Sequence, residues 1–126
     1  MIVFKGNPPS TQNIYRYACR GKWPTYYMTK EGKEAKARFI EEAKEQHKGK
    51  LIFGKIKMDL KFFFRDRRVR DVDNYNKLVL DALSGVVYED DKQIDDLRIR
   101  KYHSKENPRV EIEIEEIGQI NFLKEC

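Results

Sequence analysis

The stretch IFGKIKMDLKFFF, residues 52–64, carries the clearest secondary-structure signal in the chain, and it runs directly into RDRRVRDVDNYNK, residues 65–77. From position 55 onward, apolar residues alternate with mostly charged ones, which is the period of two of a half-buried β-strand. The inward face of this strand would carry Ile56, Met58, Leu60, Phe62 and Phe64. The sequence therefore predicts a long strand over 52–64 that ends where a run of arginines begins.

Helices are expected on both sides of this strand. Before it, residues 30–47 place apolar side chains at helical spacing among lysines and glutamates, and Thr29 is a suitable N-cap. After it, Asp73 can cap a second helix over roughly 74–84, which would end at Ser84-Gly85. The buried face of this second helix would carry Tyr75, Leu78, Val79, Ala82 and Leu83.

Shorter strands are expected towards the two ends of the chain. Residues 2–4 read as a short strand, and the aromatic and basic segment 15–28 reads as a long loop with a strand near its end. Alternating patterns predict half-buried strands at 97–101 and 110–115, joined by a turn around Asn107-Pro108. This order of elements is typical of an α+β fold, with a mixed or antiparallel sheet and helices packed on one face.

Size and composition favour one soluble domain. A chain of 126 residues can bury roughly two thirds of its unfolded surface, so we expect a single domain over 1–126 with a C-terminal tail at 118–126. The cysteines, Cys19 and Cys126, have no partners at metal-ligand spacing, which argues against a disulfide framework or a zinc site. Without a signal peptide or an apolar run of spanning length, the sequence favours a reducing, cytoplasmic compartment and no membrane contact.

Charge is unevenly placed along the chain. The net charge is +5 with 37% charged residues, and this modest excess gains meaning because arginines gather between positions 65 and 70. Arginines suit the phosphates of a nucleic acid, whereas carboxylates repel them. Acidic residues beside an arginine cluster therefore point to a divalent cation between carboxylate and phosphate.

The carboxylates form two groups. Asp71 and Asp73, two residues apart, would point to the same side of an extended segment and repel each other. A Mg²⁺ ion would relieve this repulsion, and Asp91 would complete a three-carboxylate site, with Asp90 as an alternative ligand. Such a site can activate water and stabilise negative charge on phosphorus, so we expect metal-assisted phosphodiester hydrolysis.

Basic and polar residues would hold the substrate. Lys77 lies one helical turn after Asp73 and could orient the nucleophile or neutralise the leaving oxyanion. Guanidinium groups would bind the flanking phosphates. The residues expected to bind DNA are Arg65, Arg67, Arg68, Arg70 and Asn74.

Each of these features also has an ordinary structural explanation. Asp73 could serve as a helix cap alone, and Glu89-Asp90-Asp91 could be a solvated turn. Lys77 and Asp81 could form a simple i, i+4 pair. The ordered combination favours a metal-dependent nuclease acting on DNA or RNA. The alternative from another class is a non-catalytic nucleic-acid-binding module, which would bind without Mg²⁺ and would not cut.

The combination resembles the RusA family of Holliday junction resolvases. The similar part is the pattern Arg-x-Arg-Asp-x-Asp-Asn-x-x-Lys from Arg68 to Lys77, followed by Asp81-Ala82-Leu83 and by Asp90-Asp91 with Gln93 just beyond. A second similarity is Pro8-Pro9-Ser10 with Asn13. The resemblance extends roughly from Gly6 to Glu115, and its central motif is the specific part.

The resemblance implies a homodimer, of bacterial or prophage origin, that binds four-way DNA junctions and cuts symmetric strands with Mg²⁺, for which Mn²⁺ could substitute. It assigns the essential aspartates to Asp71, Asp73 and Asp91 and the functional lysine to Lys77. A relaxed nuclease of branched or flap DNA would differ in substrate range alone. For the dimer interface we expect exposed aromatic residues of the 15–28 segment or of the long 52–64 strand, where Phe62, Phe63 and Phe64 would form a patch.

Overall fold

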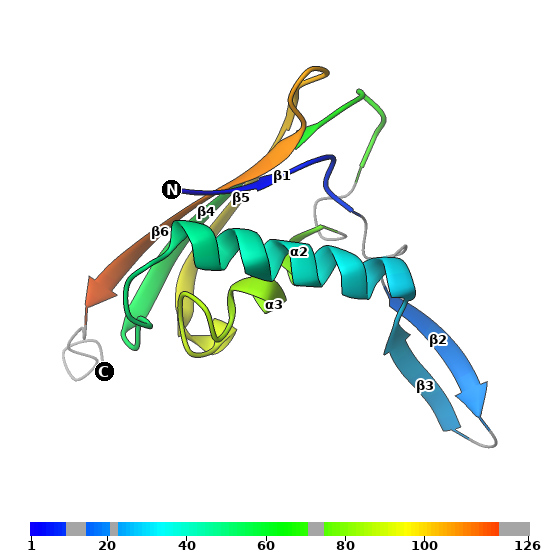
Figure 1. The fold of residues 1–126 in the computed structure, drawn as a ribbon, viewed down its shortest axis with the longest axis horizontal. Coiled ribbons are helices and arrows are strands. Elements are labelled where there is room, and N and C mark those ends of the chain that lie inside the picture. The colour runs from blue at the N-terminus through cyan, green and yellow to red at the C-terminus, as the bar shows by residue number, and fades with distance from the viewer. Residues whose placement is uncertain (10–14, 21–22, 71–74, 119–126) are drawn as a thin grey trace.

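The computed structural model describes residues 1–9, 15–20, 23–70 and 75–118, with the backbone alone for 15–20 and 23–26. At its centre is a four-stranded sheet in the order β1-β6-β4-β5 (Figure 1). Strand β4 is parallel to β5 and antiparallel to β6, and β6 is antiparallel to β1. The mixed sheet confirms the expected α+β class. The four strands are β1 (Ile2–Lys5), β4 (Lys55–Phe64), β5 (Ile94–His103) and β6 (Arg109–Gly118).

Strand β4 occupies an inner position of the sheet and has two different faces. Its five alternating apolar side chains, Ile56 to Phe64, are all buried, as the sequence predicts. On the opposite face, Lys57 is exposed and Asp59 forms an ion pair with Arg100 of β5 (Asp59 Oδ2 to Arg100 Nη2, 2.7 Å). This division explains why only one face of the sheet can receive the helices.

Helices α2 (Lys30–Gln46) and α3 (Asn76–Leu83) lie over the apolar face (Figure 1). The predicted N-cap of α2 is confirmed, because the Thr29 hydroxyl accepts a hydrogen bond from the Gly32 amide at 3.1 Å. Phe39 of α2 stacks on Phe4 of β1 with ring centroids 4.3 Å apart. Burial of each such ring stabilises the fold by about 1.5–3 kcal/mol, which fixes α2 across the sheet.

The start of α3 differs from the prediction. The helix begins at Asn76, two residues later than expected, and its N-cap position is occupied by Tyr75, whose side chain makes no capping hydrogen bond. The expected cap, Asp73, lies outside the described residues. The buried face is as expected, with Leu78, Val79, Ala82 and Leu83 inside the core and Tyr75 at its edge. Within the described residues, helix α3 is therefore placed by its apolar face.

The last two strands are joined in sequence but do not pair with each other. Residues 104–108 connect β5 to β6, and β4 lies between these two strands. Strand β5 is consequently at the edge of the sheet, where Leu97 is 38% exposed. The expectation of two half-buried strands is confirmed for β6, with Val110 and Ile112 buried. In β5, Ile99 packs partly buried against the core, but Leu97 is exposed.

The 15–28 segment is a hairpin rather than the expected long loop. Strands β2 (Tyr15–Arg20) and β3 (Trp23–Met28) pair antiparallel, with Tyr15 opposite Met28. Two aromatic-rich runs separated by Gly21 and Lys22 satisfy each other's backbone groups without the main sheet. The hairpin projects from the N-terminal end of α2, away from the four-stranded sheet (Figure 1).

The expected aromatic patch at 62–64 does not exist as one surface. Phe62 and Phe64 are buried in the chain's own core, where Phe64 meets Tyr75 edge-on at 4.8 Å. Phe63 points to the opposite face, where it stacks on Tyr102 at 5.0 Å. The prediction of a three-phenylalanine interface is wrong because neighbouring side chains of a strand face opposite sides.

Candidate active site

The acidic turn, residues 89–93, is brought back to α3 by a tight connection. Ser84 ends α3, and Gly85 takes φ +85°, a conformation that favours glycine. Tyr88 is fully buried, and its hydroxyl donates a hydrogen bond to the Leu80 carbonyl at 2.8 Å. Burial and the carboxylates around it raise the pKa of this phenol far above its ordinary range. Tyr88 therefore stays neutral and fixes the chain just before the acids.

The Asp90 and Asp91 side chains of the acidic turn share a hydrogen bond, and the charges of Asp81 and Lys77 on α3 act on Asp91. The pKa of Asp91 is raised by a side-chain hydrogen bond with Asp90, then by partial desolvation, and then by the negative charges of Asp90 and Asp81. The positive charge of Lys77 opposes this rise. Lys77 itself pairs with Asp81 across one helical turn (Nζ to Oδ2, 3.6 Å). The fold thus concentrates negative charge at Asp91.

Asp90 and Asp91 have different roles in the turn. Asp90 is the N-cap of the short 3₁₀ turn η2 (Asp91–Gln93), and its Oδ1 accepts a hydrogen bond from the Lys92 amide at 3.2 Å. The contacts with Asp91 and the Lys92 amide lower the pKa of Asp90. Asp91 is exposed and caps nothing in the described structure. This contrast favours Asp91 over Asp90 as a ligand for an external group.

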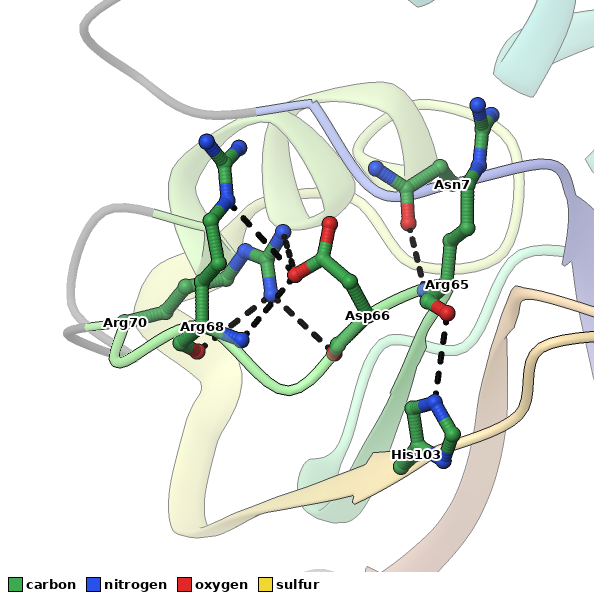
Figure 2. A network of polar contacts seen from close by, with 6 residues as sticks. All are labelled: Asn7, Arg65, Asp66, Arg68, Arg70 and His103. Atoms are coloured by element: carbon green, nitrogen blue, oxygen red, sulfur yellow. Dashed lines mark hydrogen bonds and ion pairs between the residues drawn. The ribbon is translucent and has the colours of Figure 1, made fainter.

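A second polar region is the arginine loop, residues 65–70, which follows the end of β4. Figure 2 shows that Asp66 is its hub. Asp66 Oδ1 accepts a hydrogen bond from the Arg68 amide at 3.0 Å and lies 2.8 Å from Arg70 Nη2. The Arg68 amide, followed by Arg70, lowers the pKa of Asp66. Asp66 therefore stays ionised and folds the loop back on itself.

The arginines of this loop divide into two kinds. The Arg70 side chain is only 8% exposed, because its guanidinium group lies over the Phe64 ring at 4.5 Å while it pairs with Asp66. The Arg68 side chain is 80% exposed, and Arg65 and Arg67 are also exposed. Arg70 thus serves the loop itself, and the other three arginines are accessible to a phosphate.

Both ends of the arginine loop are attached to other elements. Asn7 Oδ1 accepts a hydrogen bond from the Arg65 amide at 2.9 Å, and His103 Nε2 lies 3.2 Å from the Arg65 carbonyl (Figure 2). At the other end, Lys101 Nζ donates to the Arg70 carbonyl at 2.6 Å. Strand β5 and the segment after β1 therefore hold the loop beside the end of the sheet.

Three of the residues that the sequence singles out, Asp71, Asp73 and Asn74, lie outside the described residues. Within the described part of the chain, no group of three or more His, Cys, Asp or Glu side chains is arranged to hold a metal ion. A helix long and apolar enough to cross a membrane is likewise not found among those residues. The convergence of Asp71 and Asp73 with Asp91 stays a prediction.

The protein-family model for endodeoxyribonuclease RusA matches residues 5–115 of this chain. The chain belongs to the RusA endodeoxyribonuclease family. This match confirms the resemblance, and its range includes both the arginine loop and the acidic turn. The chain is also 52% identical over 48 residues to the uncharacterized protein YqaN of Bacillus subtilis (strain 168). That segment is 38% of this chain and 33% of YqaN, so the chain aligns with about a third of that relative's length.

Sequence reasoning missed several contributors to the site of this RusA family member. The sequence offers Asp81 only as a possible i, i+4 partner of Lys77, and the structure shows that its charge also acts on Asp91. Tyr88 and His103 received no role. A usable sequence signal is Tyr88, which follows two valines and precedes the acidic pair by two residues. A tyrosine expected in the core needs a hydrogen-bond partner for its hydroxyl group nearby. His103 carried no comparable signal.

Proposed function

We propose that this chain is a divalent-metal-dependent endodeoxyribonuclease that binds four-way DNA junctions and cuts strands of like polarity as a homodimer. Two supports carry this proposal. The first is membership of the RusA endodeoxyribonuclease family over residues 5–115. The second is the exposed Asp91 carboxylate, which precedes β5, shares a hydrogen bond with Asp90 and experiences the charges of Asp81 and Lys77.

The carboxylates fit a hard divalent cation. Oxygen ligands of aspartate are what Mg²⁺ prefers, with several waters retained. The hydrogen bond with Asp90 and partial desolvation raise the pKa of Asp91, and the negative charges of Asp90 and Asp81 add a repulsion that a cation would relieve. We propose Asp71, Asp73 and Asp91 as the ligands, and Asp90 as a residue that shapes the turn. When bound, Mg²⁺, or Mn²⁺ in its place, would supply Lewis acidity and a water of lowered pKa.

The remaining residues would bind and orient the substrate. Lys77 is exposed on the first turn of α3, and its ammonium group can neutralise the leaving oxyanion or orient the attacking water. The exposed Arg65, Arg67 and Arg68 can bind phosphates that flank the cut, together with Asn74. Arg70 supports this surface from beneath by its contacts with Asp66 and Phe64.

The homodimer follows from the reaction. Resolving a four-way junction requires two cuts, and a monomer with one site offers one. A twofold dimer would place two equivalent sites on a junction of approximate twofold symmetry. Light scattering at micromolar concentration should give about twice 15.1 kDa, the mass of one chain. A chain that stays monomeric on junction DNA would contradict the resolvase proposal.

The direct test uses purified protein with labelled four-way junction, flap, linear duplex and single strand, each with and without Mg²⁺. We expect paired cuts in the junction with Mg²⁺, binding without cutting in its absence, and little cutting of the linear substrates. Equal cutting of flaps and junctions would favour a relaxed nuclease of branched DNA. Tight binding with no cleavage in Mg²⁺ or Mn²⁺ would favour the non-catalytic binding module.

A further inference from the structure

Gln93 connects the acidic turn to a segment distant in sequence. Its Oε1 accepts a hydrogen bond from the Asp90 amide at 2.9 Å. Its Nε2 donates to the Ile52 carbonyl at 2.8 Å and to the Gly54 carbonyl at 2.9 Å. Both ends of one half-buried amide are therefore engaged, with the turn on one side and the chain leading into β4 on the other.

The segment that Gln93 contacts is itself fixed to the connection after α3. The Ile52 amide donates to the Val87 carbonyl at 2.9 Å, and Ile52 forms a parallel bridge with Tyr88. Tyr88 in turn donates to the Leu80 carbonyl of α3. Through Gln93, the turn that carries Asp91 is thus attached to the segment at Ile52, which is itself bonded to the Val87-Tyr88 connection and so to α3.

We propose that Gln93 is a positioning residue for Asp91: it holds the acidic turn at a fixed distance from Lys77 and Asp81 and so prepares Asp91 to receive a divalent cation. The metal-binding role of Asp91 in this inference rests on the proposed function, whereas the hydrogen bonds of Gln93 are observed independently of it. The hydrogen bond from the Asp90 amide to Gln93 Oε1 is the link through which Gln93 acts on the turn.

Loss of the amide would release the turn from both sides. Without Gln93, the Asp90 amide and the carbonyls of Ile52 and Gly54 would have to find water or remain unpaired. Asp90 would keep its bond with the Lys92 amide, so the turn could persist with a less defined position. Residues that orient metal ligands typically contribute 10- to 100-fold to metal affinity or activity.

The test compares Gln93→Met with a matched control, Gln46→Met. Both replacements keep side-chain length and remove an amide that joins two segments. Gln46 accepts from the Val3 amide at 2.7 Å and donates to the Val3 carbonyl at 2.8 Å, which ties α2 to β1. Gln46 is not part of the acidic turn or of the arginine loop. The control therefore reports what a loss of stability alone does.

Two readouts are needed for each variant. The first is the Mg²⁺ dissociation constant from an NMR titration that follows the Asp91 amide signal, with hydrogen exchange of the Asp90 amide measured on the same sample. The second is the Mg²⁺ concentration for half-maximal junction cleavage, with junction binding measured in the absence of metal. Gln93→Asn, which retains a shorter amide, replaces Gln93→Met if the latter does not fold.

We expect Gln93→Met to speed hydrogen exchange of the Asp90 amide. The variant should also raise the Mg²⁺ dissociation constant and the Mg²⁺ concentration for half-maximal cleavage, each roughly 10-fold, with junction binding unchanged. Gln46→Met should leave both Mg²⁺ values as in wild type. An unchanged Mg²⁺ dissociation constant in Gln93→Met, or an equal change in Gln46→Met, would overturn the positioning role. If wild type binds Mg²⁺ but cuts nothing, the proposed function fails, while the NMR comparison still decides the role of Gln93.

Discussion

The arginine loop and the acidic turn both hold side chains of like charge close together, positive in the loop and negative in the turn. Each places several like-charged side chains close together, and each uses one of them for its own structure. In the arginine loop that residue is Arg70, which is almost buried between Asp66 and Phe64. In the acidic turn it is Asp90, which caps η2. Arg68 and Asp91, by contrast, are among the exposed residues of the two regions.

The two regions differ in how the repulsion is handled. The arginine loop contains its own counter-ion, because Asp66 pairs with Arg70 at 2.8 Å and lies 3.6 Å from Arg68 Nε. Near the acidic turn, Lys77 of α3 is already paired with Asp81, and the charge of Lys92 acts on Asp90. The hydrogen bond with Asp90, followed by partial desolvation and the charges of Asp90 and Asp81, raises the pKa of Asp91, whereas the Arg68 amide and Arg70 lower the pKa of Asp66. A region with unbalanced charge is the one expected to recruit an external ion.

The largest expected effect comes from the two aspartates after the arginine loop. Asp71→Asn and Asp73→Asn should each reduce junction cleavage by roughly 100-fold or more, because amides are poorer ligands for Mg²⁺. Junction binding without metal should be retained, as measured by gel shift. A variant that cuts near the wild-type rate would remove its residue from the proposed ligand set.

The next largest effect is expected from substitution of Lys77, which should slow the cleavage step without weakening junction binding. Lys77→Ala is expected to lower the single-turnover cleavage rate by roughly 10- to 100-fold at saturating enzyme. Lys77→Arg keeps the charge and should lose less. If both variants bind junction DNA more weakly and cut bound DNA normally, Lys77 is a phosphate contact only.

Substitutions in the arginine loop test the contrast between the exposed Arg67 and Arg68 and the nearly buried Arg70. Changing Arg67 and Arg68 to Ala should weaken binding to all DNA sequences and flatten its salt dependence by about one unit of log–log slope per lost phosphate contact. Arg70→Ala should instead cost about 1 kcal/mol of folding stability, since it removes an ion pair and a cation–π contact. Equal salt slopes in all three variants and wild type would mean that none of these arginines binds phosphate.

A smaller effect concerns stability without metal. Because the pKa of Asp91 is raised above its ordinary 3.8 in the folded chain, ionisation of Asp91 opposes folding as pH rises through that region. Asp91→Asn should therefore melt slightly above wild type near pH 7 in EDTA. The difference should vanish below about pH 3, where wild-type Asp91 is protonated in both states. A lower melting temperature for Asp91→Asn near pH 7 would contradict the account of its environment.

Much of the fold is encoded in local patterns. The alternation in residues 55–64 predicts β4 and its buried face, and Thr29 predicts the start of α2, because both depend on nearest neighbours in the chain. The hairpin at 15–28 and the edge position of β5 were not predicted. Pairing partners and strand order depend on which distant segments meet, and the sequence of one segment does not state that.

The candidate site shows the same limit more sharply. Arg67, Arg68 and Arg70 are the same residue type within four positions, and only the placement of Phe64 and Asp66 makes Arg70 internal. Asp90 and Asp91 are likewise adjacent and chemically equal in the sequence. The hydrogen bonds of the turn are what separate a cap from an exposed carboxylate.

The most direct measurement compares Asp91→Asn with Asp90→Asn in single-turnover cleavage of a four-way junction at saturating Mg²⁺. Asparagine caps helical turns about as well as aspartate, so Asp90→Asn keeps the structural role of that residue. We predict a loss of roughly 100-fold or more for Asp91→Asn and a loss of less than about 10-fold for Asp90→Asn, with both variants binding the junction. An active Asp91→Asn beside an inactive Asp90→Asn would contradict the assignment of Asp91 as the ligand and Asp90 as the cap.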